Sequence, residues 1–178
     1  MIAIKIDGSE QFDPSTNSFY IVETTTVRLE HSLRSVAEWE SKYHKPFLSQ
    51  EGKTIAESID YIRLMSIDDV DPLVFNNLNE THIKAINEYI EDPMTATTFG
   101  RQPPRGKKEI ITAELIYYWM IANNIPFECE KWHLNRLLTL IRVCGIKNAP
   151  PKKMSKKNIM SQNAAINAAR RAANGSTG

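Results

Sequence analysis

The last 27 residues of the chain contain no acidic side chain, and the run Ala149-Pro150-Pro151 separates them from the rest. Six Lys and Arg residues lie between Lys152 and Gly178, whereas the preceding part holds 16 Lys+Arg against 21 Asp+Glu. Proline cannot continue a helix, and it disfavours a helical residue before it. The sequence therefore predicts a mildly acidic globular body and a basic tail that contacts something the body does not.

The body has enough apolar residues for one folded domain, since 42% of the 178 residues are hydrophobic. Its two cysteines, Cys129 and Cys144, form no disulfide framework and fit a reducing compartment. The N-terminus becomes polar at Asp7, which argues against a signal peptide. The apolar stretch Ile110–Ile125 is too short and too polar to span a bilayer. We expect a soluble, intracellular protein.

Residues 1–30 carry the pattern of β-strands. Isoleucine alternates with other residues between Met1 and Asp7, which predicts a half-buried strand. The segment from Gly8 to Ser18 has the composition of a loop, and Phe19 to Leu29 is aromatic and β-branched. We expect a hairpin with a long loop, which must pack on helices or pair with another chain.

Helical signals follow from residue 31 on. Ser32 can cap a helix that continues to Tyr43 and stops at Lys45-Pro46. Thr54 and Glu57 have the spacing of a capping box. We expect the helix that they start to bury the side chains of Ile55, Ile59, Ile62 and Met65.

Further helix starts are predicted at Asp71-Pro72, for a short turn, and at Asn79. The segment Pro93–Lys108 reads as an exposed loop. The helix that Asn79 starts has isoleucines on one face, at Ile83, Ile86 and Ile90.

From Glu109 the sequence ITAELIYYWMIANN is apolar on nearly all sides, which predicts a central helix. A second long helix is expected from about Glu128 to Cys144, with Gly145 as its stop. A last helical segment begins near Ser155. The apolar stripe of the second helix consists of Leu134, Leu137, Leu138, Ile141 and Val143, and the aromatic residues Tyr117, Tyr118, Trp119 and Trp132 are expected in the core, with a groove for a partner helix as the alternative.

The sequence thus predicts a mainly α fold in three parts. Residues 1–30 form a β-hairpin, and residues 31–148 form a multi-helix body. Residues 149–178 form a detached basic, Ala-rich tail that is partly helical or disordered.

Candidate metal and catalytic sites have simpler structural interpretations. Cys129 and His133 are four residues apart and could lie on one helical face, but His31, His44 and His82 are too scattered to complete a tetrahedral site. We favour a buried cysteine and an interfacial histidine.

Carboxylates give no clear acid–base pair either. Glu114 lies just after Thr112, where it favours the helix dipole, although Glu128 and Glu130 follow soon after. The basic segment Gly100–Lys108 lacks the ending of a phosphate-binding loop. We expect no enzyme activity, no metal and no cofactor.

The basic tail invites a nucleic-acid interpretation, because Lys and Arg release counterions from phosphates. The tail has no aromatic residue for stacking on bases, however, and the acidic body would repel a polyanion. Its large apolar residues Ile159, Met160 and Ile166 are too few for membrane binding. The remaining interpretations of the tail are that it binds a protein partner with an acidic surface or that it keeps the chain soluble. A stripe of small residues that could pack against another helix is formed by Ala164, Ala165, Ala168, Ala169, Ala172 and Ala173.

Four stretches resemble a known family. They are HSLRSVAEWESKYHKPFL with Trp39 and Pro46, YIEDPMTATTF from Tyr89, EIITAELIYYWMIANNIPFECEKWHLNRLLTLIRVC with Trp119, and the closing SQNAAINAARRAANG. Together they cover most of residues 31–175 and resemble the tail assembly chaperones of long-tailed, siphovirus-type bacteriophages.

The resemblance implies a non-enzymatic helper in the cytoplasm of an infected bacterium. It would bind the tape-measure protein, help to recruit tail-tube subunits, associate with itself in some cases, and be absent from the mature virion. A longer frameshifted form would share this body. We assign partner binding to aromatic and basic side chains, namely Trp39, Tyr43, Trp132, Lys156, Lys157, Arg170 and Arg171.

Two other functions are left open. One is a structural virion protein of the phage tail or neck, with the hairpin joining a ring of subunits. The other, which we favour less, is a nucleic-acid-binding protein that uses the region Lys152–Arg171. Steep salt dependence of DNA binding, lost with the tail, would identify the second.

Overall fold

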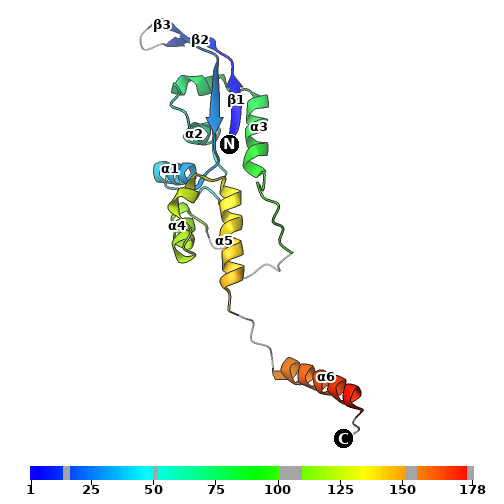
Figure 1. Ribbon diagram of the computed structural model, residues 1–178. Coiled ribbons are helices and arrows are strands. Elements are labelled where there is room, and N and C mark those ends of the chain that lie inside the picture. Colours follow the sequence, from blue (N-terminus) through cyan, green and yellow to red (C-terminus); the bar gives the residue numbers. More distant parts are fainter. Residues whose placement is uncertain (14–16, 50–51, 101–109, 151–155, 176–178) are drawn as a thin grey trace. The chain divides into compact units, whose positions relative to one another are not determined.

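The computed structural model describes residues 1–13, 17–49, 52–100, 110–150 and 156–175, and the protein is mainly α-helical, as predicted (Figure 1). The chain divides into two compact units, Met1–Ile146 and Lys147–Gly178. The helices within the described residues are α1 (Leu33–Tyr43), α2 (Ile55–Leu64), the 3-10 helix η1 (Pro72–Asn77), α3 (Glu80–Glu91), α4 (Ala113–Ala122), the 3-10 helix η2 (Phe127–Lys131), α5 (Leu134–Asn148) and α6 (Lys156–Asn174).

One antiparallel hairpin makes up the β-structure of the first unit. Ile2 pairs with Leu29 and Asp13 pairs with Ser18, so both ladders keep the same register, although residues 7–8 and 23–24 between them are unpaired. The loop predicted from residue 8 to residue 18 is therefore wrong, because cross-strand pairing extends well into it. Its strands are β1 (Ile2–Ile6), β2 (Ser9–Asp13), β3 (Ser18–Val22) and β4 (Thr25–Leu29), with β1 paired to β4 and β2 paired to β3.

At Gly8 the inward-facing side chains of the hairpin change from even-numbered to odd-numbered positions. Strand β1 buries its even-numbered isoleucines, whereas β2 turns its odd-numbered residues Ser9 and Gln11 inward. A Cβ at Gly8 would lie 2.3 Å from the carbonyl oxygen of Val22 and 2.8 Å from the backbone nitrogen of Thr24. The two backbones therefore approach too closely for any side chain at this position. Beyond this point the β2–β3 end projects from the helices (Figure 1).

Helix α1 is central to the first unit and follows the prediction. Ser32 caps it by accepting the backbone N–H of Ser35 at 3.2 Å. The side chain of Trp39 is only 1% exposed, and its indole N–H donates to the backbone carbonyl of Glu57 at 3.0 Å. This bond joins α1 to α2 and satisfies the only polar group of the buried Trp39 side chain.

The capping box that starts α2 is confirmed, since Glu57 accepts the N–H of Thr54 at 2.8 Å and Thr54 accepts the N–H of Glu57 at 3.2 Å. The predicted apolar face is only partly right. Ile62 is buried, but Ile55 is 82% exposed, and the buried side chain of the first turn of α2 is that of Glu57. Tyr61 is buried as well.

The predicted helix starts at Asp71 and Asn79 are confirmed, with η1 and α3 following them. Asp71 accepts the N–H of Leu73, and Asn79 accepts the N–H of His82. Among the isoleucines of α3, Ile86 is fully buried and the other two are half-buried. Helix α3 and η1 both pack against β1, so the hairpin base has helices to cover its apolar face.

Helix α4 forms where an apolar helix was predicted, but it is not buried on all sides. Ala113, Ile116 and Met120 are buried, whereas Tyr118 is 62% exposed and Ile121 is 60% exposed. The prediction of a central helix with Tyr118 in the core is therefore wrong. Helix α1 packs against α4, and η2 contacts it through Tyr117, so the side with Tyr118 and Ile121 stays exposed.

The long helix predicted from residue 128 begins later and ends later. Residues of η2 come first, and a β-bridge between Ser32 and His133 separates them from α5. Gly145 does not stop α5, because it keeps an ordinary helical backbone and the helix continues to Asn148. The predicted stripe is confirmed for Leu134, Leu137 and Ile141, which are buried; Leu138 and Val143 are half-buried.

The second unit contains α6, which confirms the prediction of a last helical segment. Its side chains from residue 158 to residue 174 are all exposed within this unit. The residues of the predicted loop from 101 to 108 lie outside the described part of the chain, and residues 93–100 have no regular secondary structure.

Candidate functional site

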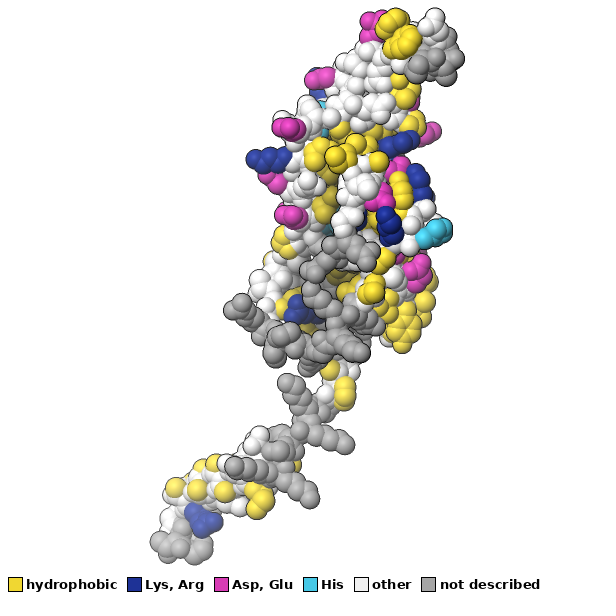
Figure 2. Space-filling view, turned by 180° about the vertical axis from the view of Figure 1, so that it is seen from behind, with side chains coloured by type: hydrophobic (Ala, Val, Ile, Leu, Met, Phe, Trp, Pro, Cys, Tyr) yellow, Lys and Arg dark blue, Asp and Glu magenta, His cyan; other side chains and the backbone are white. Residues whose placement is uncertain are grey.

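An exposed apolar face on α4 is the most unusual surface of the first unit. Tyr118 and Ile121 lie on this face, three residues apart and both more than half exposed. Ile110, just before the helix, is 65% exposed, and Phe127, at the start of η2, is 55% exposed. We call these four side chains the α4 face. Hydrophobic side chains are seen gathered over α4 in the space-filling view (Figure 2).

Acidic residues flank the α4 face along the chain. Glu114 lies in the first turn of α4, and Glu128 lies in η2, beyond the C-terminal end of the helix. Both side chains are exposed, and neither forms an ion pair within the described residues. Apolar side chains with uncompensated carboxylates beside them are suited to a partner that is apolar and basic.

The tight connection after α4 sets the position of Phe127. Asn124 has a left-handed backbone with φ of 53°, and the N–H of Ile125 returns to the carbonyl of Met120 at 2.8 Å. The rings of Tyr117 and Phe127 lie 6.1 Å apart, and the Tyr117 hydroxyl donates to Glu130 at 2.7 Å. Burial and this carboxylate raise the pKa of Tyr117 above its usual range. The α4 face is thus held by a rigid turn.

A second exposed apolar surface lies on the β2–β3 end of the hairpin. Phe12 and Phe19 pair across the strands with ring centroids 5.1 Å apart, and Ile21 is 79% exposed beside them. The opposite side of the hairpin is fixed to η1, where Gln11 donates to Asn77 at 3.0 Å. The aromatic pair therefore points away from the helices, and we call Phe12, Phe19 and Ile21 the hairpin face.

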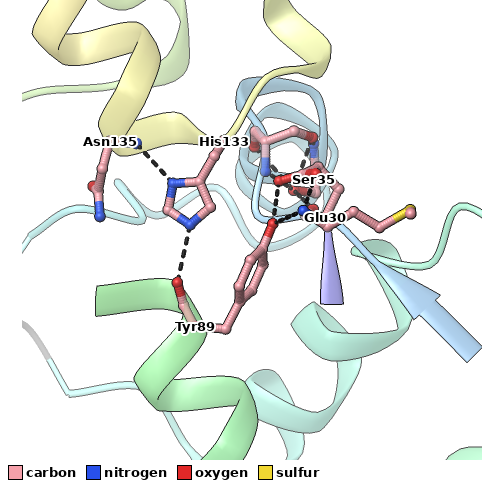
Figure 3. A network of polar contacts seen from close by, with 7 residues as sticks. Glu30, Ser35, Tyr89, His133 and Asn135 are labelled. Carbon is pink, nitrogen blue, oxygen red and sulfur yellow. Dashed lines mark hydrogen bonds and ion pairs between the residues drawn. The ribbon is translucent and has the colours of Figure 1, made fainter. Parts of the chain in front are cut away.

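A network of polar contacts ties the N-terminal strand to α3 and α5 (Figure 3). The hydroxyl of Tyr89 donates to Glu30 at 2.5 Å, and the N-terminal ammonium group lies 2.7 Å from the same carboxylate. On the other side, His133 Nε2 donates to the carbonyl of Tyr89 at 3.0 Å, and its Nδ1 accepts the N–H of Asn135 at 3.3 Å. Burial and the Glu30 carboxylate raise the pKa of Tyr89 above its usual range.

His31 lies next to this network and deep in the core. Its Nδ1 is 2.6 Å from the hydroxyl of Tyr61, and its ring centroid is 5.2 Å from that of His133. Burial and the neighbouring His133 lower the pKa of His31 to about 4. Among the described residues, no buried side-chain nitrogen or oxygen lacks a hydrogen-bond partner, and the bonds of this cluster join α2, α3 and the start of α5 in the core.

The aromatic residues assigned to partner binding lie in three different environments. Trp39 fills the core and presents no surface. Tyr43 is half-buried, and its hydroxyl donates to Asp60 at 3.0 Å. Trp132 is also half-buried, with the guanidinium of Arg136 4.2 Å above its ring. The structure therefore does not bring these three side chains into one surface.

The basic residues assigned to partner binding all fall within α6. Arg170 and Arg171 are exposed near its C-terminal end, with Arg171 in the last turn, and Lys156 and Lys157 are its first two residues.

Cys129 and His133 do not share a helical face, contrary to the spacing argument. Cys129 lies in η2 and is buried, and His133 precedes α5 and is also buried. The β-bridge at His133 is what separates them. Within the described residues, no group of three or more His, Cys, Asp and Glu side chains is placed to hold a metal ion.

Sequence reasoning favoured the core for Tyr118, with a groove for a partner helix as the alternative, and it assigned no surface role to Ile110, Ile121 or Phe127. Tyr118 and Ile121 were read as core because the segment is apolar all round. The size of the chain could have indicated this exposure. A ten-residue helix with apolar residues on every side is fully buried only if other elements pack around all of it, and a larger domain would be needed to supply them.

No protein-family model matches the chain, and neither a curated protein nor a solved structure is significantly similar to it. In the part of the chain that the structure describes, no helix has the length and hydrophobicity needed to cross a membrane.

Proposed function

We propose that this chain is a non-enzymatic tail assembly chaperone of a long-tailed bacteriophage, which binds the tape-measure protein in the host cytoplasm and helps to recruit tail-tube subunits. The resemblance of residues 31–175 to that family supports the proposal. The single structural observation that carries it is the α4 face, with Tyr118 and Ile121 at helical spacing and both mainly exposed.

The α4 face has the properties that helix-in-groove recognition requires. It presents apolar side chains on a rigid helix, and a long amphipathic client would cover them with its own apolar face. Such burial shields both partners from aggregation, because exposed apolar patches of this kind otherwise associate without specificity. The chain would leave once tube subunits cover the client, so we expect it to be absent from the mature virion.

The basic α6 is proposed as a detached helix that serves interactions of its own. It carries six positive charges with the residues preceding it and no negative one, whereas the body is acidic. A longer frameshifted form would be extended from this end. Neither feature is needed for the folding of the first unit, which has its own core.

Co-expression with the tape-measure protein of the same phage tests the proposal. The wild-type chain should keep that protein soluble and co-purify with it. Tyr118→Glu should weaken the complex about tenfold or more, because burying an unpaired carboxylate costs over the ~1.4 kcal/mol that corresponds to tenfold. The side chain is 62% exposed in the free protein, so the fold should tolerate the change.

Ile55→Glu is the matched control, because Ile55 is an exposed isoleucine on a different helix at 82% exposure. It should bind the tape-measure protein like the wild type. If both variants bind equally well, or if the wild type does not bind at all, the proposed function is contradicted.

A structural virion protein of the tail or neck is the second candidate, and the hairpin face favours it. Phe12, Phe19 and Ile21 project on a ribbon whose other side is fixed to η1, which is an arrangement suited to joining subunits in a ring. A nucleic-acid-binding role for α6 has less support, since the helix has no aromatic residue.

A further inference from the structure

Helix α6 has a pattern of residues that complements the α4 face. Ile159 and Ile166 are seven residues apart and therefore lie on one side of the helix, each 43% exposed. Arg170 follows Ile166 by four residues, so the same side of the helix carries an exposed basic residue near its C-terminal end. The order along this side is apolar, apolar, basic.

The α4 face carries the opposite charge. Glu114 precedes Tyr118 by four residues and Ile121 by seven, so the exposed carboxylate lies on the same side of α4 as these two apolar side chains. Two copies of α6 would bring only positive charges together, and two copies of the α4 face would bring only negative ones. The pairing of an α6 side with an α4 face is the one that matches both apolar surface and charge.

We propose that α6 of a second copy of this chain occupies the α4 face. The two isoleucines of α6 would cover Tyr118 and Ile121, and Arg170 would lie near Glu114 with the two helices antiparallel. The inference rests on the proposed function in taking the α4 face as a binding surface, and it adds an occupant that the chain itself supplies.

Such an arrangement would make α6 a placeholder for the client. A helix from a second copy would shield the α4 face when no client is present, and a longer client helix would displace it. The same contact, repeated from copy to copy, is head-to-tail and would produce chains or rings along an extended client. Binding of α6 should weaken as salt is added, since part of the attraction is between exposed charges.

Disulfide trapping between full-length copies tests the contact. In a Cys144→Ser background, one variant carries Ala122→Cys, next to the α4 face, and the other carries Ala169→Cys on α6. Both alanines are exposed, and the apolar side chains of the contact are kept. Mixing the two under mild oxidation should give the mixed dimer about tenfold faster than random collision, because binding raises the effective concentration of the thiols.

Ala56→Cys replaces Ala122→Cys in the control, since Ala56 is an exposed alanine on α2. Its mixed dimer with Ala169→Cys should form slowly, and Glu114→Lys should slow trapping of the pair Ala122→Cys and Ala169→Cys. Equal rates for the two pairs would overturn the proposal. So would a double variant, Ala122→Cys with Ala169→Cys, that closes its disulfide within one chain and forms none between copies.

No client is present in this experiment, so its failure is separate from failure of the proposed function. Binding of the tape-measure protein without specific trapping would contradict only the proposed α6 contact. Specific trapping without binding of the tape-measure protein would support the α6 contact and contradict the proposed chaperone function.

Discussion

Glu40 and Ala113 join two helices that are 73 positions apart in the sequence, because the Oε2 atom of Glu40 accepts the backbone N–H of Ala113 at 2.7 Å. Ala113 is the first residue of α4, so the carboxylate lies at the positive end of the helix dipole. The other oxygen accepts the N–H of Phe47 at 2.6 Å. One buried side chain thus fixes the position of α4, and with it the α4 face, against α1.

Glu40→Ala should destabilise the protein by about 2–4 kcal/mol, since it leaves two backbone N–H groups without an acceptor in the core. Urea unfolding followed by circular dichroism measures this change. Glu38→Ala is the control, because Glu38 is exposed on the same helix and forms a surface ion pair with Arg34. It should change the stability by less than about 0.5 kcal/mol, and an equal loss in both variants would contradict this account of Glu40.

Substitution of two glycines by alanine should have opposite effects. Gly8→Ala places a Cβ against the backbone of Val22 and should cost about 1–3 kcal/mol. Gly145→Ala lies in an exposed part of α5 with nothing within 4 Å, and it should stabilise by about 0.5–1 kcal/mol. Thermal unfolding of both variants gives the comparison, and a neutral Gly8→Ala would show that the two backbones do not approach each other at this position as described.

Stability should fall as the pH is lowered from about 6.5 towards 4. Burial lowers the pKa of His31 to about 4, so below the unfolded value of 6.5 the unfolded chain binds a proton that the folded chain does not. The contribution is fully present above pH 6.5 and amounts to at most about 3 kcal/mol. Free energies of unfolding between pH 4 and 8 measure the slope.

His31→Gln should flatten this pH dependence, since glutamine can keep a hydrogen bond to Tyr61 but does not titrate in this range. The control is His44→Asn at the exposed C-cap of α1, where the left-handed backbone also suits asparagine. That variant should keep the wild-type pH dependence. If the stability of His31→Gln still fell steeply below pH 6.5, the pH dependence would originate from another titratable group.

The two tryptophans Trp39 and Trp119 should differ in their importance for stability. Trp39 is fully buried with its N–H bonded, so Trp39→Ala should cost about 3–5 kcal/mol or prevent folding. Trp119 is half-buried on α4, and its truncation should cost only about 1–3 kcal/mol. Chemical unfolding of the pair would contradict this assignment if Trp119→Ala were the more damaging change.

Removal of residues 152–178 should leave the first unit folded. The core consists of residues between Ile4 and Ile141, and none of its members lies in the second unit. The melting temperature of the truncated chain should be within about 2–4 °C of the full-length value, a shift that corresponds to ~1 kcal/mol. A much larger fall would show that α6 stabilises the body and would argue against a detached helix.

The sequence predicted most helix starts because they depend on local chemistry. Ser32, Thr54, Asp71 and Asn79 each accept a backbone N–H two or three residues later, and that spacing can be read directly. The helix ends were harder. Gly145 was read as a stop, but nothing in the structure requires a left-handed residue there, and α5 continues.

Faces of helices were predicted less well than their starts, because burial depends on which neighbours the fold supplies. The β2 strand has no apolar alternation of its own and is held by its pairing with β3 and by Gln11. The α4 face was hidden by uniform hydrophobicity, and Glu40 was hidden because its partners Phe47 and Ala113 are distant in sequence. These contacts are tertiary, so no local pattern encodes them.

Quantitative mass spectrometry of this protein, in a lysate of infected cells and in purified particles, tests the chaperone assignment most directly. The account predicts that the protein is abundant in the lysate and absent from the particles. Its presence in particles at a fixed copy number would contradict the account and would make the chain a structural component of the tail or neck.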